Sequence, residues 1–147
     1  MIVLCVFVLT GCTEHSNYFY SGMENKDIPE LSNSQSIEFF NVYKGHTDNW
    51  AAVYIIYKTK DTDNYVTKKL LKYIGKKPNP TGKISYDYDA GDDVGSGGVS
   101  VTDEPENGIY DLGPSTVMTA LGQDYIVKFL IKWEEHSEMI EMKSEKE

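Results

Sequence analysis

Thiols are almost absent from this sequence. Its two cysteines, Cys5 and Cys12, both lie within the first twelve residues, so residues 13–147 contain none. That long stretch therefore has no disulfide, no thiolate metal ligand and no cysteine nucleophile. Its stability must come from a packed core, for which one domain of this length is sufficient.

Positive charge is also scarce. The chain has 14 Lys and Arg against 23 Asp and Glu, which gives a formal net charge of -9. Such a surface repels nucleic-acid phosphates and anionic lipid headgroups. DNA and RNA are therefore excluded as partners, and attachment to a membrane would have to come from something other than a basic patch.

No apolar run approaches the ~20 residues that a helix needs to cross a bilayer. Residues 2–9 form an unbroken apolar run that leads into Leu9-Thr10-Gly11-Cys12. A run of this length fits the core of a signal peptide. The alternative is a first buried strand. We favour the signal peptide because the run lacks polar alternation and is followed by polar residues rather than a turn.

Leu9-Thr10-Gly11-Cys12 resembles the lipobox of bacterial lipoproteins, in which Leu, a small or Thr residue, and Gly or Ala precede Cys. The resemblance implies that the Cys12 thiol receives a diacylglyceryl group and that the chain is cut between Gly11 and Cys12. Residues 1–11 would then be a removed signal peptide. The mature protein would be held by its acyl chains on the extracytoplasmic face of the cell membrane.

Residues 12–36 are expected to be the lipidated cysteine and a flexible tether, because Asn, Ser, Asp and Glu dominate and no periodicity is present. The segment also carries four large apolar or aromatic side chains: Tyr18, Phe19, Tyr20 and Met23. These could rest on the membrane interface or on the folded domain, or could be occasional aromatics in a disordered linker; we favour the linker. The composition changes at residue 37, which places a domain at residues 37–143 and a charged tail at residues 144–147.

From residue 37 onward, short runs of Val, Ile, Tyr and Phe alternate with clusters of Gly, Pro, Asn and Asp, as is typical of strands and turns. Strands are expected at residues 37–43, 50–58, 65–74, 83–89, 99–102, 116–120, 125–133 and 138–143. Residues 90–98 are expected to be a glycine-rich loop. The strand at residues 50–58 is apolar on both faces and should be central.

Seven or eight short strands with turn signals every eight to twelve residues predict an all-β fold. We expect a single antiparallel β-sandwich of immunoglobulin-like or fibronectin-III-like kind. Trp50 and Trp133 are predicted to be core anchors rather than platforms for carbohydrate stacking, because both lie in alternating apolar strands.

The order of features, a lipobox, a polar segment and a small β domain, looks like small lipoproteins of Gram-positive bacteria of the Bacillus and Listeria type. The resemblance rests on Tyr43-Lys44-Gly45-His46-Thr47-Asp48-Asn49-Trp50, which contains a Gly-x-Ser/Thr-x-x-Trp stretch, and on a late Ile131-Lys132-Trp133 strand. It implies no catalytic residues.

One acidic segment could bind a metal. Four carboxylates, those of Asp87, Asp89, Asp92 and Asp93, lie at a strand end and in the adjoining loop. Calcium takes six to eight oxygen ligands from clusters of this kind. The alternative, which we favour, is that Asp and Gly simply form turns here.

Other chemical motifs are weak. The glycines of residues 91–98 lack the Gly-Lys-Ser/Thr ending and the following helix of a phosphate loop. His15, His46 and His136 lack the spacing of a zinc site, although His46 with Asp48 could form a metal or acid-base pair.

These observations favour a non-catalytic, lipid-anchored binding domain of the cell envelope. Its partners would be the membrane, through diacylglyceryl-Cys12, and an envelope protein or cell-wall component. Two alternatives stay open: a calcium-dependent binder or envelope enzyme using the segment from Asp87 to Asp93, and a structural spacer of the envelope.

Overall fold

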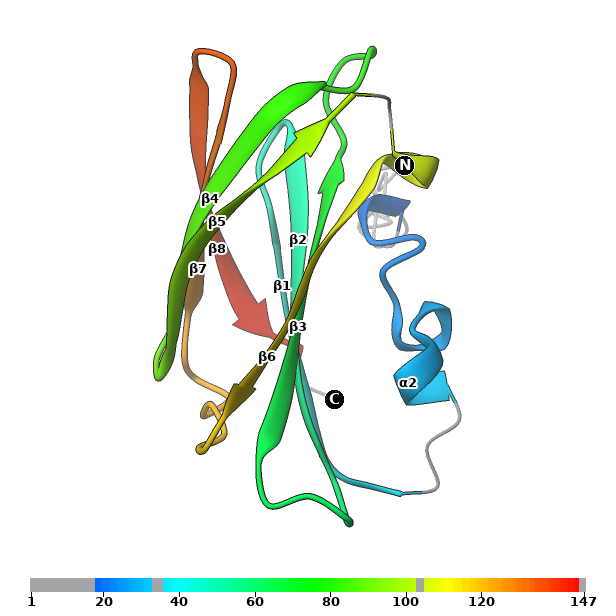
Figure 1. Cartoon of the computed structure of the whole chain (residues 1–147), viewed down its shortest axis with the longest axis vertical. Helices are drawn as coiled ribbons and strands as arrows, with labels where there is room; N and C mark the ends of the chain where they lie inside the picture. The colour runs from blue at the N-terminus through cyan, green and yellow to red at the C-terminus, as the bar shows by residue number, and fades with distance from the viewer. Residues whose placement is uncertain (1–17, 33–35, 103–104, 146–147) are drawn as a thin grey trace, which may run out of the picture.

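A computed structural model describes residues 18–32, 36–102 and 105–145 (Figure 1). The predicted signal peptide and the lipid site at Cys12 lie outside these residues.

The described chain forms eight antiparallel strands in one hydrogen-bonded sheet, in the order β5-β4-β7-β8-β1-β2-β3-β6. The strands are β1 (Ile37–His46), β2 (Trp50–Thr59), β3 (Tyr65–Tyr73), β4 (Gly82–Ala90), β5 (Asp93–Val101), β6 (Ile109–Val117), β7 (Val127–Trp133) and β8 (His136–Ser144). The prediction of an all-β antiparallel fold is confirmed.

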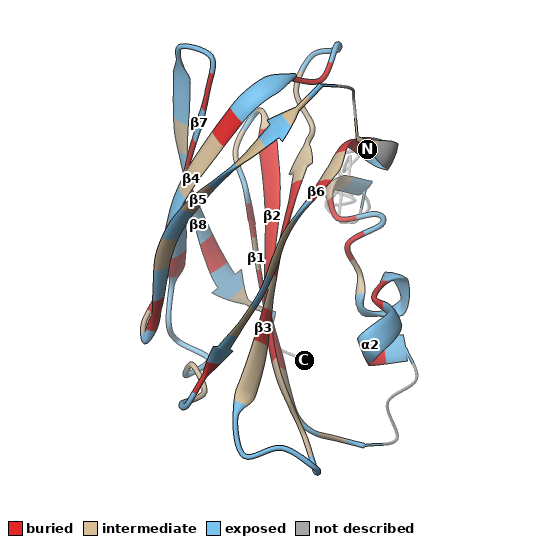
Figure 2. Ribbon diagram, viewed as in Figure 1, coloured by how far each residue is buried: buried red, intermediate tan, exposed pale blue. Residues whose placement is uncertain are grey.

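The sheet rolls so that its two halves face each other across the main core (Figures 1 and 2). One half is β6-β3-β2-β1 and the other is β8-β7-β4-β5. The halves are joined by a short β1–β8 pairing, Tyr43 with Ser144 and Lys44 with Lys143. Trp50 and Trp133 pack edge to face in this core with ring centroids 5.5 Å apart, so their prediction as core anchors is confirmed.

β2 is buried on both faces, as its sequence predicted. Trp50, Tyr54 and Ile56 face the main core between the two halves. Val53 and Ile55 point the opposite way and belong to a second apolar cluster on the outer face of the sheet. These outward-facing apolar side chains would be exposed to water unless another segment packed against them.

Residues 18–32 supply this cover, which differs from the expected flexible tether. They include a 3₁₀ turn, η1 (Asn25–Asp27), and a short helix, α2 (Pro29–Ser32), and lie along the outer face of the sheet (Figure 1). Four buried side chains hold them there: Tyr20, Met23, Ile28 and Leu31. The turns are too short to produce a periodic sequence pattern, so the polar composition concealed the packing.

The glycine-rich loop predicted at residues 90–98 is wrong, because most of it is strand β5. Gly95 pairs with Tyr88 and Gly97 with Tyr86 across the β4–β5 ladder. A Cβ added at Gly97 would lie 2.5 Å from Tyr86 Oη, and one at Gly95 would lie 2.8 Å from Tyr88 Oη. The glycines thus leave room for tyrosine rings.

The strand predicted at residues 116–120 is misplaced, since β6 runs from Ile109 to Val117. The turn signal Gly113-Pro114 lies inside it, at a break in the β3–β6 register between Lys68 and Leu70. Gly113 has a φ of 83° and opens this bulge. A proline is tolerated here because β6 is an edge strand.

Candidate interaction surface

The structure does not bring the four candidate calcium ligands together. Asp87 lies on the outer face of β4 and pairs with Lys132 Nζ at 2.8 Å, whereas Asp93 is turned into the core. Asp89 and Asp92 flank the β4–β5 turn and accept hydrogen bonds from residues 118–126. Within the described ranges, no group of three or more His, Cys, Asp or Glu side chains is arranged to hold a metal ion.

Asp93 is the acceptor at the centre of a buried hydroxyl network. Its Oδ2 accepts from Tyr54 Oη at 3.0 Å and from Thr67 Oγ1 at 2.9 Å, and its Oδ1 accepts from Tyr88 Oη at 2.9 Å. Burial raises the pKa of both tyrosines, with the Asp93 charge adding to the effect. The network joins β5 to β2, β3 and β4.

Lys69 completes this network with a buried positive charge. Its side chain is 3% exposed, and Nζ lies 3.5 Å from Asp93 Oδ2 and 2.6 Å from Ser115 Oγ on β6. Burial lowers the Lys69 pKa, and the neighbouring Asp93 opposes that shift. Through Asp93 and Ser115, Lys69 links the two edge strands β5 and β6, which are not paired with each other in the described part of the sheet.

Sequence reasoning missed Lys69, although a signal was present. Thr67, Lys69 and Leu71 alternate on one face of β3, and Leu71 points into the main core. A lysine on that face predicts a buried partner of opposite charge.

The end of the molecule around the β4–β5 turn is held by residues 118–126. Tyr125 Oη donates to Asp89 Oδ1 at 2.9 Å, and Thr119 Oγ1 donates to Asp92. Tyr43 Oη, from β1, donates to the Gly122 carbonyl at 3.0 Å. The hydrogen bond to Asp89 is the main cause that raises the Tyr125 pKa. These contacts fix the segment to both halves of the sheet.

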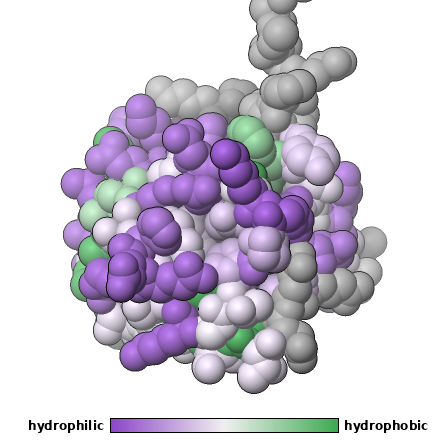
Figure 3. Space-filling view, turned by 90° about the horizontal axis from the view of Figure 1, so that it is seen from above, coloured by the Kyte–Doolittle hydropathy of each residue, from purple (hydrophilic) through white to green (hydrophobic). Residues whose placement is uncertain are grey.

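Four apolar or aromatic side chains are exposed at this end. Met118 is 84% exposed and Val94 is 66% exposed, and Tyr125 and Ile126 are partly exposed. We call these four residues, together with the carboxylates of Asp89, Asp92 and Asp124, the end surface. It lies at the lower left of Figure 1, whereas the opposite end, seen in Figure 3, is mostly hydrophilic.

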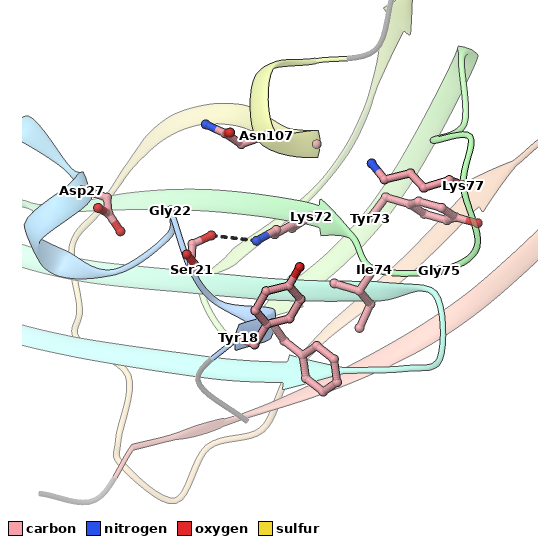
Figure 4. A pocket seen from close by; sticks show the side chains of 12 residues that line it. Tyr18, Ser21, Gly22, Asp27, Lys72, Tyr73, Ile74, Gly75, Lys77 and Asn107 are labelled. Carbon is pink, nitrogen blue, oxygen red and sulfur yellow. Dashed lines mark hydrogen bonds between the residues drawn. The ribbon is translucent and has the colours of Figure 1, made fainter. Parts of the chain in front are cut away.

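A hollow of about 600 Å³ lies between residues 18–32 and the end of β3 (Figure 4). Lys72 Nζ crosses it to donate to the Ser21 carbonyl at 2.8 Å. Burial, and then the nearby Lys77, lowers the Lys72 pKa. Asp27, from the covering segment, and Asn107, from the turn before β6, also line the hollow. Because Lys72 Nζ already donates a hydrogen bond to the covering segment, we interpret this hollow as part of the contact between that segment and β3 rather than as a binding site.

His46 and His136 each contact a neighbouring aromatic ring. His46 Nδ1 lies 3.3 Å from the Thr47 carbonyl, and its ring contacts Phe19 with centroids 4.8 Å apart. His136 packs on Trp133, with ring centroids 5.4 Å apart. His15 lies outside the described residues.

Comparison with protein-family models, with curated proteins and with solved structures finds no match to this chain. Among the described residues, no helix combines the length and the apolar character that a membrane span requires.

Proposed function

We propose that this chain is a lipid-anchored protein of the extracytoplasmic face of the cell membrane, whose β domain is a non-catalytic interaction module. Diacylglyceryl-Cys12 attaches the protein to the membrane, and the domain binds a protein or cell-wall component of the envelope. We also propose that the β domain is an immunoglobulin-like or fibronectin-III-like sandwich, an architecture that many cell-surface domains share.

One observation carries the proposal: exposed apolar side chains gather at one end of the domain, and residues 18–32 run along the outer face of the sheet from the other end. Tyr18 follows Cys12 by six positions in the sequence. Six residues reach at most about 20 Å. An anchor at Cys12 would thus lie within about 20 Å of the start of the described segment, which Figure 1 shows in dark blue at the end away from the end surface.

The calcium-dependent alternative gains no support from the geometry. Asp87 is paired with Lys132, and Asp93 is enclosed by hydroxyl donors and Lys69. A structural spacer remains distinct from an interaction module, because a spacer needs no exposed apolar group at its far end.

Lipid attachment is tested by replacing the acceptor sulfur. Cells producing the wild type, Cys12→Ser or Cys5→Ser are fed a fatty-acid analogue, and the N-terminus is determined by mass spectrometry. Cys12→Ser should abolish the label and leave an uncleaved or released protein. Cys5→Ser should keep the label, because Cys5 lies in the removed segment. An unmodified Met1 on the wild-type protein in the envelope would overturn the proposal.

A further inference from the structure

We infer that the end surface binds a protein segment that combines apolar side chains with Lys or Arg. This inference deepens the proposed role as an interaction module, and it does not depend on lipid attachment.

The first argument is the concentration of exposed apolar area. Single exposed apolar residues are ordinary on protein surfaces, but a group of them marks an interaction site. Val94 is the second residue of β5, and Met118 and Ile126 lie at the two ends of residues 118–126, so two separate parts of the chain contribute to one end. Met118 is a flexible, polarizable side chain of the kind that adapts to a partner.

The second argument is rigidity. The Tyr125–Asp89 and Thr119–Asp92 hydrogen bonds attach residues 118–126 to the β4–β5 turn. A Cβ added at Gly91 would lie 2.9 Å from Leu121, so the two segments are also in close apolar contact. A surface held in this way loses little conformational entropy when it binds.

The third argument is charge. Asp89 and Asp92 place two carboxylates beside the apolar group, and Asp124 directly precedes Tyr125 in the same segment. Lys128 is in register with Asp89 on the outer face. The whole chain carries a net charge of -9. A basic partner is therefore attracted, whereas a second copy of this chain would bring the same carboxylates against them.

The test uses the full chain in native membranes with a photo-crosslinking amino acid at residue 118, and the same amino acid at residue 139 as a matched control. Met139 is also exposed and apolar, but it lies on the outer face of β8. Crosslinked peptides are sequenced by mass spectrometry. We expect residue 118 to capture a segment that contains both apolar residues and Lys or Arg, and residue 139 to capture none.

A second measurement tests affinity with a defined probe. A synthetic Leu/Lys peptide should bind the purified Met118→Asp/Ile126→Asp variant at least tenfold more weakly than it binds the purified Met139→Asp variant. Equal affinity for the two variants would show that the end surface is not the binding site, and equal binding of an all-Lys peptide would show that only net charge is read. Either result would overturn the inference.

Crosslinks to an acidic or uncharged segment, to a second copy of this chain, or to nothing would overturn it too. The fatty-acid label, measured on the same cells, reports separately on the lipid anchor, so the two proposals can fail independently.

Discussion

Lys69 Nζ lies 3.5 Å from Asp93 Oδ2 inside the core, and this pair joins β3 to the first residue of β5. A buried ion pair is costly to form, yet the removal of one partner leaves the other charged and unsatisfied. The exposed pair of Asp87 and Lys132, which joins β4 to β7, provides a direct comparison.

Asp93→Ala should therefore lower the free energy of unfolding by about 3–5 kcal/mol, because it strands Lys69 and three hydroxyl groups. Asp87→Ala should cost about 0–1 kcal/mol, since its partner is solvated. Urea unfolding followed by tryptophan fluorescence measures both. Equal costs for the two variants would contradict the central role of the Asp93 network.

Gly45 is expected to be intolerant of any side chain. A Cβ at this position would collide with the Glu141 carbonyl oxygen of β8, next to the short β1–β8 pairing that joins the two halves. Gly45→Ala should cost about 1–3 kcal/mol through displaced backbone.

Gly122→Ala is the matched control, because nothing lies within 4 Å of a Cβ there. Thermal melting of the two variants should show a clear loss for Gly45→Ala and little change for Gly122→Ala. Similar melting temperatures would mean that β8 can move away from β1 without cost.

Met23→Ala should destabilise the whole domain, although Met23 lies in the segment expected to be a tether. Its side chain is buried in the outer cluster with Ile28 and Val53. Truncation of such a side chain costs about 2–5 kcal/mol. Tyr18→Ala, at a largely exposed position of the same segment, should cost far less. If Met23→Ala left the unfolding midpoint unchanged, residues 18–32 would not be part of the cooperative fold.

Alkaline pH should destabilise the protein through its buried tyrosines. Burial raises the pKa of Tyr43 to about 12 and that of Tyr20 to about 12, against about 10 in an unfolded chain. Below pH 10 both states are protonated and stability is unaffected. As the pH rises from 10 to 12, only the unfolded state loses these protons, so stability falls.

Lys69 acts in the opposite direction below pH 10.5, because its lowered pKa makes the folded state release a proton first. Urea midpoints should therefore be compared between pH 10.5 and 11.5. Tyr43→Phe should show a shallower decline than the wild type over that range. An equal slope would mean that Tyr43 ionises as readily in the folded state.

The strands that carry strong side-chain alternation or continuous apolar character were predictable from sequence. β2 and β4 were placed nearly to the residue, since their burial patterns follow their sequences directly. β5 was not predicted as a strand, because its glycines make room for the rings of Tyr86 and Tyr88, which lie on the neighbouring strand. Such a cross-strand requirement leaves no local signal.

Only part of the end surface could be predicted from the sequence. The segment from Asp87 to Asp93 was identified as unusual, but its carboxylates were read as potential ligands of one ion. Each carboxylate instead contacts a residue that is distant in sequence. Asp89 accepts from Tyr125, Asp92 accepts from Thr119, and Asp93 lies beside the buried Lys69. Pairing at that range follows from the sheet order and not from composition.

The packing of residues 18–32 has a mechanical consequence. If the acyl chains hold one end of the protein and a partner holds the end surface, tension enters the body through this segment. It is held by buried side chains such as Met23 and Leu31 rather than by a sheet ladder, so it would peel away before any strand separates. Those fifteen residues could release about 50 Å of chain. Detachment would also expose the outer apolar cluster to water, so the load would lower the stability of the eight strands.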